Sequence, residues 1–119
     1  MTPERAASLV VSRVFFTSLG EEAFFRGYVQ SRANAAFGRP ARILGVACGP
    51  GLVISAALFG LVHFLNPTLY FHGGWEVSPS LGLAAFGSGL LFGYLREMTS
   101  GIWAGVLVHG TSGACGAVR

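Results

Sequence analysis

The feature that most constrains the fold is a short charged segment inside an apolar sequence. Glu21, Glu22 and Arg26 lie between glycines at positions 20 and 27, and valine, phenylalanine and leucine are frequent just before them. Ionisable side chains in apolar surroundings are expensive, and they persist where they face a protein interior or a wet cavity and pair with one another. A fold for this chain must therefore bring partners to these three charges.

On a helix, Glu22 and Arg26 are four residues apart, so they share a face and can form an ion pair. Glu21 lies about 100° around the helix from Glu22. We therefore expect that the two carboxylates cannot point at one partner and that Glu21 is the freer group. The alternative is a solvated turn or an ordinary surface ion pair, but charge in apolar surroundings favours a functional role.

The composition indicates a membrane protein. Of the 119 residues, 52% are hydrophobic and 11% are charged, whereas a typical soluble domain carries about 25% charged residues. We expect one all-α domain over 1–119, a polytopic membrane bundle of about four helices with an active site between them. The net charge of +3 comes from arginines alone, which is too small and dispersed an excess to predict nucleic-acid binding.

Apolar runs and breaks at glycine and proline divide the chain into four expected helices. These cover residues 3–34, 43–65, 81–95 and 101–118. The segment Gly49-Pro50-Gly51 predicts a kink early in the second helix. The arginine-rich connector 32–42 is typical of a cytoplasmic loop, and the polar segment 66–80 is expected on the opposite side. We expect Cys48 and Cys115 to be buried free thiols.

Residues spaced by four share one face of a helix. The faces that carry His63 and His109 also carry small residues, and small residues let helices approach closely in lipid. Both histidines are therefore expected to project into the bundle. Either one alone is equally well explained as a hydrogen bond between helices, but two histidines and a glutamate on three helices are harder to explain in that way. The residues of these faces are at 51, 55, 59 and 63, at 85, 89, 93 and 97, and at 101, 105, 109 and 113.

These residue types allow two kinds of hydrolysis. A carboxylate that burial and a nearby arginine tune in opposite directions suits a general base that takes a proton from water, and a neutral histidine can donate to an oxyanion. Glu21, His63 and His109 also match the two histidines and one glutamate of a catalytic zinc site. The spacing does not distinguish the two.

Three motifs occur in order along the chain: Glu-Glu-x-x-x-Arg at 21–26, Phe-x-x-x-His at 59–63, and a late histidine, His109. This ordered set resembles the CPBP family of CAAX proteases and bacteriocin-processing enzymes, also called Abi proteins. The resemblance covers about residues 10–113. Its first motif alone would be weak, but the set at these separations is specific.

The resemblance implies a multi-pass protein of the cell membrane and an intramembrane endopeptidase, including removal of the last three residues of prenylated CAAX proteins. Glu21 would activate water, Glu22 and Arg26 would position it, and His63 and His109 would contact the water or the oxyanion. Substrates would be membrane proteins or prenylated or leader peptides within the lipid bilayer. We favour a mechanism without a cofactor, with zinc on Glu21, His63 and His109 as the alternative.

Two departures from the family pattern leave other functions open. The chain has Gly113 where the family commonly has asparagine, so Thr111, Ser112 or water would have to supply the missing donor. Family members also usually have more spans before the first motif, which predicts a fragment or a need for a partner membrane subunit. An inactive scaffold that binds peptides is the first alternative, and a small transporter subunit is the second.

Overall fold

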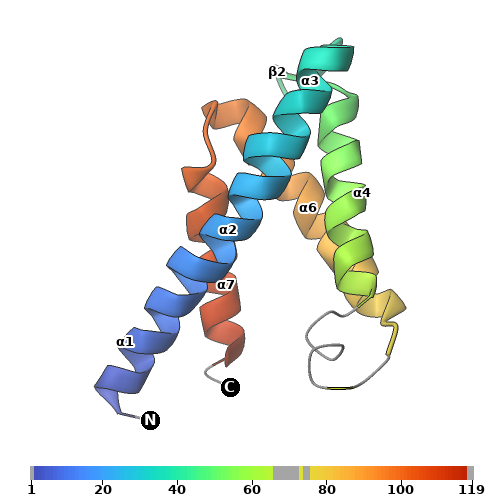
Figure 1. Cartoon of the computed structure of the whole chain (residues 1–119). Helices are drawn as coiled ribbons and strands as arrows, with labels where there is room; N and C mark the ends of the chain where they lie inside the picture. The colour runs from blue at the N-terminus through green and yellow to red at the C-terminus, as the bar shows by residue number, and fades with distance from the viewer. Residues whose placement is uncertain (1, 66–72, 74–75, 118–119) are drawn as a thin grey trace.

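The structure is a computed structural model that describes residues 2–65, 73 and 76–117 (Figure 1). Within these residues the chain forms four long helical segments and one short β-hairpin. The elements are α1 (Pro3–Val11), η1 (Ser12–Ser18), α2 (Leu19–Glu22), η2 (Ala23–Gln30), α3 (Ser31–Phe37), β1 (Ala41–Ile43), β2 (Val46–Cys48), α4 (Pro50–Phe64), α6 (Pro79–Thr99) and α7 (Trp103–Ala117).

The helix predicted over 3–34 is confirmed and runs on to Phe37, as the unbroken ribbon from α1 to α3 shows (Figure 1). The hydroxyl of Thr2 caps its start by accepting the backbone N–H of Arg5 at 3.3 Å. Gly38, at φ 71°, ends it. Two stretches, η1 and η2, have the wider hydrogen-bonding pattern of a π-helix. Such turns are frequent at functional sites, and η2 contains Arg26.

The helix predicted over 43–65 is wrong at its start, because residues 41–48 form an antiparallel hairpin in which Ile43 pairs with Val46. The two turn residues, Leu44 and Gly45, both have positive φ, as a two-residue hairpin turn of this kind requires. An apolar run does not reveal such a turn. Helix α4 begins only at Pro50, so proline occupies a first-turn position, where its missing N–H does no harm, and the predicted kink is a helix start.

The other two predicted helices are confirmed with shifted ends, 79–99 for 81–95 and 103–117 for 101–118. The hydroxyl of Ser78 caps α6 by accepting the N–H of Leu81 at 3.3 Å. Helices α4 and α6 cross closely where glycines meet: a Cβ added to Gly60 would lie 3.0 Å from the carbonyl oxygen of Gly82. Of the polar loop expected over 66–80, residues 66–72 and 74–75 lie outside the described residues.

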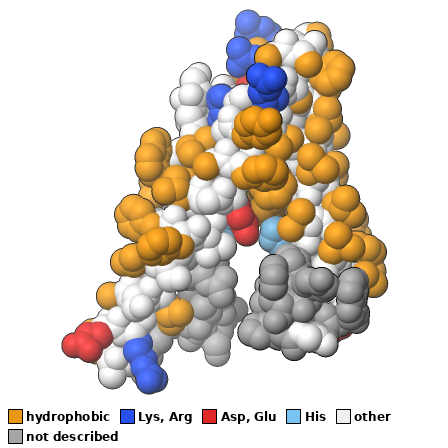
Figure 2. Space-filling model, viewed as in Figure 1, with side chains coloured by type: hydrophobic (Ala, Val, Ile, Leu, Met, Phe, Trp, Pro, Cys, Tyr) orange, Lys and Arg blue, Asp and Glu red, His pale blue; other side chains and the backbone are white. Residues whose placement is uncertain are grey.

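The buried core is small and aromatic, formed by Phe25, Phe59, Ala85 and Phe92. Many large apolar side chains are exposed instead, and they cover much of the visible face in Figure 2. Among the described residues, none of the helices combines the length and the hydropathy needed to span a bilayer. The prediction of about four helices is confirmed. The prediction that these helices are membrane spans is not confirmed. Cys48 is a buried free thiol as predicted, whereas the side chain of Cys115 lies outside the description.

Candidate active site

The predicted ion pair between Glu22 and Arg26 is confirmed, and it is fully buried. Both residues have 0% exposure, and Arg26 Nη1 lies 3.3 Å from Glu22 Oε1. Helix α2 contributes the carboxylate and η2 contributes the guanidinium, one turn apart. Two charges removed from water are tolerated only when each finds compensating partners, so the surroundings of this pair decide whether the fold can hold it.

His109 of α7 connects both carboxylates. Its Nδ1 lies 3.3 Å from Glu22 Oε1, and its Nε2 lies 3.5 Å from Glu21 Oε2. The expectation that the two carboxylates cannot share a partner is wrong, because an imidazole presents nitrogens on two edges and reaches both. Both nitrogens donate only when the ring is protonated. In Figure 2, acidic and histidine side chains are visible close together near the middle of the visible face.

Arg26 is held from the side opposite Glu22 by α4 and α6. Its Nη2 donates to the carbonyl oxygen of Gly89 at 3.1 Å. Its guanidinium carbon lies 4.5 Å from the ring centroid of Phe59 and 5.4 Å from that of Phe92, distances at which the ring faces attract a cation. The aromatic core thus takes part in stabilising the buried charge.

Glycines in the predicted small-residue faces let the helices approach these charges. A Cβ added to Gly105 would lie 2.7 Å from Glu22 Oε2, and one added to Gly89 would lie 3.1 Å from Arg26 Nη2. The expectation that small residues on these faces let helices approach closely is confirmed for Gly89 of α6 and Gly105 of α7. At the same time Glu22 Oε2, Glu21 Oε2 and Arg26 Nε have no hydrogen-bond partner within the described residues.

His63 of α4 lies at the same pocket as His109 but not in the same hydrogen-bonded group. The two histidines line a pocket of about 280 Å³ together with Phe59, Phe92 and Ser112. His63 Nδ1 lies 2.8 Å from the carbonyl oxygen of Phe59. A carbonyl only accepts, so Nδ1 carries the proton and Nε2 of the neutral ring is an acceptor. In the described part of the chain, no hydrogen bond or ion pair joins His63 to a glutamate.

The two residues expected to substitute for the family asparagine differ in position. Thr111 Oγ1 donates to the carbonyl oxygen of Leu107 at 2.7 Å, within its own helix. Ser112 Oγ donates to the carbonyl oxygen of His109 at 2.8 Å, and Ser112 also lines the pocket that holds both histidines. Gly113 falls within α7, but its surroundings lie outside the description.

The donors expected for zinc do not fit as they stand. Within the described ranges, no group of three or more histidine, cysteine, aspartate or glutamate side chains is arranged to hold a metal ion. Glu21 and His109 are neighbours, but both nitrogens of His109 face carboxylates, Nε2 that of Glu21 and Nδ1 that of Glu22, so neither is free to ligate a metal in this geometry. We therefore derive no step through zinc.

A second polar group continues along the same helix face, one turn after Arg26. Gln30 Nε2 donates to the carbonyl oxygen of Gly93 at 3.0 Å and to Glu97 Oε1 at 2.7 Å. Asn34 also donates to Glu97 Oε1, and Arg39 Nη1 lies 3.0 Å from Glu97 Oε2. Burial would by itself raise the pKa of Glu97, but the hydrogen bonds from Asn34, Gln30 and Arg39 outweigh burial and lower that pKa.

Sequence reasoning assigned no role to Gln30 or to the ring of Phe59. Each carried a usable signal: Gln30 follows Arg26 by four residues on a helix, and Phe59 is the first residue of the second motif. The structure places the Phe59 ring between the two histidines, with centroid distances of 4.3 Å to His63 and 5.7 Å to His109. The second motif therefore supplies a cation-binding ring as well as a histidine.

The helices thus bring Glu21, Glu22, Arg26 and His109 together in one polar cluster, with His63 at the adjoining pocket. A family model described as type II CAAX prenyl endopeptidase Rce1-like matches residues 3–115. The chain belongs to this Rce1-like family of CAAX prenyl endopeptidases, which are membrane-embedded hydrolases. Comparisons with curated proteins and with solved structures gave no match.

Proposed function

We propose that this chain is an intramembrane endopeptidase that hydrolyses peptide bonds of membrane-associated proteins with a glutamate-activated water. The observation that carries this proposal is the difference between the two adjacent carboxylates. Glu22 is buried against Arg26, while the side chain of Glu21 is 31% exposed and lies beside His109. Glu21 is thus the carboxylate that water and substrate can reach.

In the proposed reaction, Glu21 takes a proton from water as the water oxygen attacks the peptide carbonyl, and later returns a proton to the leaving amine. Arg26 pairs with Glu22, Glu22 lies beside His109, and His109 lies beside Glu21, so the base keeps one orientation. Neutral His63 is suited to accept a hydrogen bond from the water, because its Nδ1 proton is committed to the carbonyl oxygen of Phe59.

The oxyanion needs another donor, because the Nδ1–H of His63 is bonded to the carbonyl oxygen of Phe59 and both nitrogens of His109 face carboxylates. Both expected candidates donate to carbonyls of their own helix, but Ser112 is the better one because it also lines the histidine pocket. A hydroxyl that bonds a backbone carbonyl can rotate toward a stronger acceptor. Ser112→Ala should therefore lower kcat more than Thr111→Val does, and equal effects would exclude Ser112 from this role.

Replacing the proposed base tests the proposal directly. We expect Glu21→Gln to lower kcat on a farnesylated CAAX peptide in detergent by at least about 100-fold, as loss of a general base does. Glu4→Gln makes the same chemical change at an exposed residue of α1 and should leave the rate unchanged. Cleavage by Glu21→Gln at the parental rate would show that Glu21 is not the base.

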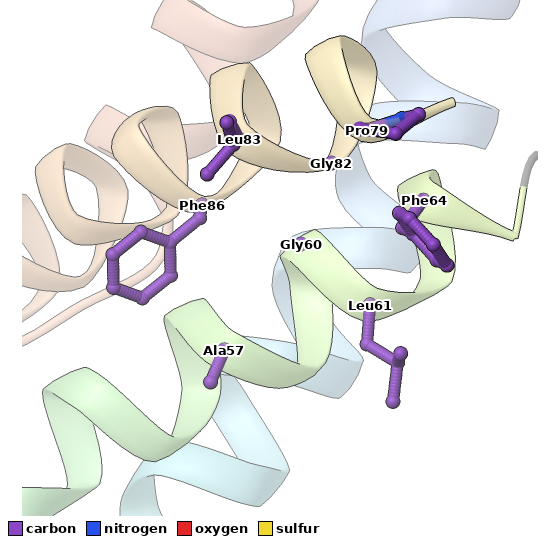
Figure 3. Close-up of a pocket in the computed structure, with 8 residues that line it drawn as sticks. All are labelled: Ala57, Gly60, Leu61, Phe64, Pro79, Gly82, Leu83 and Phe86. Atoms are coloured by element: carbon purple, nitrogen blue, oxygen red, sulfur yellow. The ribbon is translucent and has the colours of Figure 1, made fainter. Parts of the chain in front are cut away.

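We propose that the prenyl group of such a substrate lies between α4 and α6. There the two helices form an apolar groove of about 560 Å³, lined at their crossing by Gly60, Gly82 and Phe86 (Figure 3). A groove of this size is within the usual range for a drug-sized ligand. Ala57→Leu changes an exposed alanine that lines the groove, and it should raise KM for a farnesylated peptide more than for the same peptide without its lipid.

An inactive scaffold is the second candidate, and one observation favours it. Both nitrogens of His109 face carboxylates, so neither is free to meet an oxyanion in the geometry described. Gly113→Asn restores the residue that is common in the family. A large gain of cleavage would favour a degenerate site, whereas high parental activity would exclude the scaffold.

We propose a multi-pass location in the cell membrane for the chain itself. Its support is the family and the exposed apolar side chains over α4 and α6. Extraction of the expressed protein from membranes by detergent but not by alkaline carbonate would agree with this location. Recovery in the carbonate supernatant would contradict it.

A further inference from the structure

A polar pocket separate from the histidine pocket lies between α3 and the end of α6. It has a volume of about 410 Å³ and is lined by Ser31, Asn34, Ala35, Arg39, Arg96 and Ser100. Two of these six residues are arginines, and they come from parts of the chain that are far apart in sequence. The proposed proteolysis uses none of them.

The two arginines differ in how their charge is met. Arg39 Nη1 lies 3.0 Å from Glu97 Oε2. Arg96 is half-buried, and its Nη2 donates to Ser31 Oγ at 3.1 Å. Among the described residues, Arg96 makes no ion pair with an acidic side chain. A partly desolvated guanidinium that has only a neutral partner gains from an anion placed beside it.

The surroundings of the pocket are positively charged, as are the two arginines that line it. Arg32 and Arg42 lie at this end of the molecule with Arg39 and Arg96, and Glu97 is already paired. Figure 2 shows basic side chains gathered at the end where Figure 1 places α3 and β2. Such a cluster raises the local concentration of anions and attracts acidic headgroups when it lies at a membrane surface.

We infer that this pocket binds a phosphate group, with Arg96 as its principal ligand and Arg39 and Ser100 as further donors. A phosphate monoester offers three oxygens, which suits two guanidinium forks better than the two oxygens of a carboxylate do. The proposed source is the headgroup of an anionic lipid, and free inorganic phosphate is the other source of the same chemistry. The inference is independent of the proposed proteolysis.

The test is thermal stabilisation of the full chain in a neutral detergent, with dioctanoyl phosphatidate, dioctanoyl phosphatidylcholine or inorganic phosphate added. Phosphatidate should raise Tm in a saturable way and phosphatidylcholine should not. Arg96→Gln should weaken the apparent affinity for phosphatidate by about tenfold. Arg32→Gln is the matched control, since it removes the same charge from an exposed residue of α3 that does not line the pocket.

Each outcome distinguishes binding in the pocket at Arg96 from nonspecific attraction by the surrounding arginines. Equal weakening by Arg96→Gln and Arg32→Gln, or none by either, would overturn the inference. Saturable stabilisation by inorganic phosphate at the same concentration, lost in Arg96→Gln, would keep the pocket and assign it a soluble ligand. If Arg96→Gln fails to fold, Arg96→Lys keeps the charge, loses the planar fork and should bind severalfold more weakly. Glu21→Gln should bind as the parent does, which separates this result from the fate of the protease proposal.

Discussion

Glu22 and Glu97 are both buried glutamates at the contact between the first helix and its neighbours, yet their surroundings differ. Glu97 accepts hydrogen bonds from Gln30 and Asn34 on one oxygen and meets Arg39 at the other. Glu22 meets Arg26 and His109 on one oxygen, and its Oε2 has no partner within the described residues. One carboxylate is saturated, and the other is not.

The difference indicates what each cluster does. A buried carboxylate with partners at both oxygens is held rigidly, whereas a carboxylate with an unpartnered buried oxygen calls for an explanation such as a catalytic role. The Glu97 cluster joins the end of α6 to η2, α3 and Arg39. It is called saturated for its carboxylate alone, since Gln30 Oε1 and Asn34 Oδ1 have no hydrogen-bond partner within the described residues. The unsaturated cluster borders the pocket of the two histidines. This contrast between the two carboxylates supports the proposal that the Glu22 cluster is the reacting centre and that Glu97 has a structural role.

Breaking the Glu22 pair should have the largest effect. Arg26→Met leaves a fully buried carboxylate without its cation, and removal of one partner of such a pair costs about 3–5 kcal/mol. Urea unfolding followed by circular dichroism would measure this loss. The double variant Glu22→Leu with Arg26→Met removes both charges and should regain most of the stability. A double variant no more stable than Arg26→Met would mean that the loss came from packing around the guanidinium.

Adding a side chain at Gly105, where α7 approaches Glu22 Oε2, should have the next largest effect on stability. A Cβ at Gly105 would lie 2.7 Å from that oxygen, so Gly105→Ala must push α7 or the carboxylate aside, at a cost of about 1–3 kcal/mol. Gly87→Ala in α6 is the matched control, because nothing lies within 4 Å of its added Cβ. The control should be stabilised by about 0.5–1 kcal/mol through helix propensity alone. Equal shifts in Tm for the two variants would contradict the described approach of α7.

The comparison also shows which parts of the structure could be predicted from the sequence. Spacing by four placed Glu22 with Arg26, and it placed His109 on a face that packs inward; both follow from helix geometry, which is local. The hairpin at 41–48 was missed because its turn depends on positive φ at Leu44, which composition does not reveal. The partners of Glu97 were missed because its donors are distant in sequence, and only the crossing of α6 with the first helix brings them together.

Removing the charge of the saturated cluster should have a smaller effect that depends on pH. The pKa of Glu97 is lowered in the folded chain. Glu97 lies after residues 81–95, outside the apolar segment expected as a membrane helix. The contribution of ionised Glu97 to the free energy of unfolding is therefore fully present above the pKa of the unfolded chain, about 4.3. This contribution is lost as the pH falls through the lower pKa of the folded chain. Glu97→Gln should cost about 1–3 kcal/mol at pH 7 and progressively less below about pH 4. A pH-independent difference between the two proteins would contradict this assignment.

The smallest effect on stability is expected for Arg39, the exposed member of the cluster around Glu97. The side chain of Arg39 is 47% exposed, and a pair with such a partner contributes about 0–1 kcal/mol because water and salt screen it. Arg39→Gln should therefore lower the free energy of unfolding by less than Gln30→Leu, which leaves a buried oxygen of Glu97 with one donor fewer. The deficit of Arg39→Gln should also shrink when NaCl is raised from 0.05 to about 0.5 M, whereas that of Gln30→Leu should not change. A loss for Arg39→Gln that is as large as the loss for Gln30→Leu and insensitive to salt would show that Glu97 depends on the ion pair rather than on its amide donors.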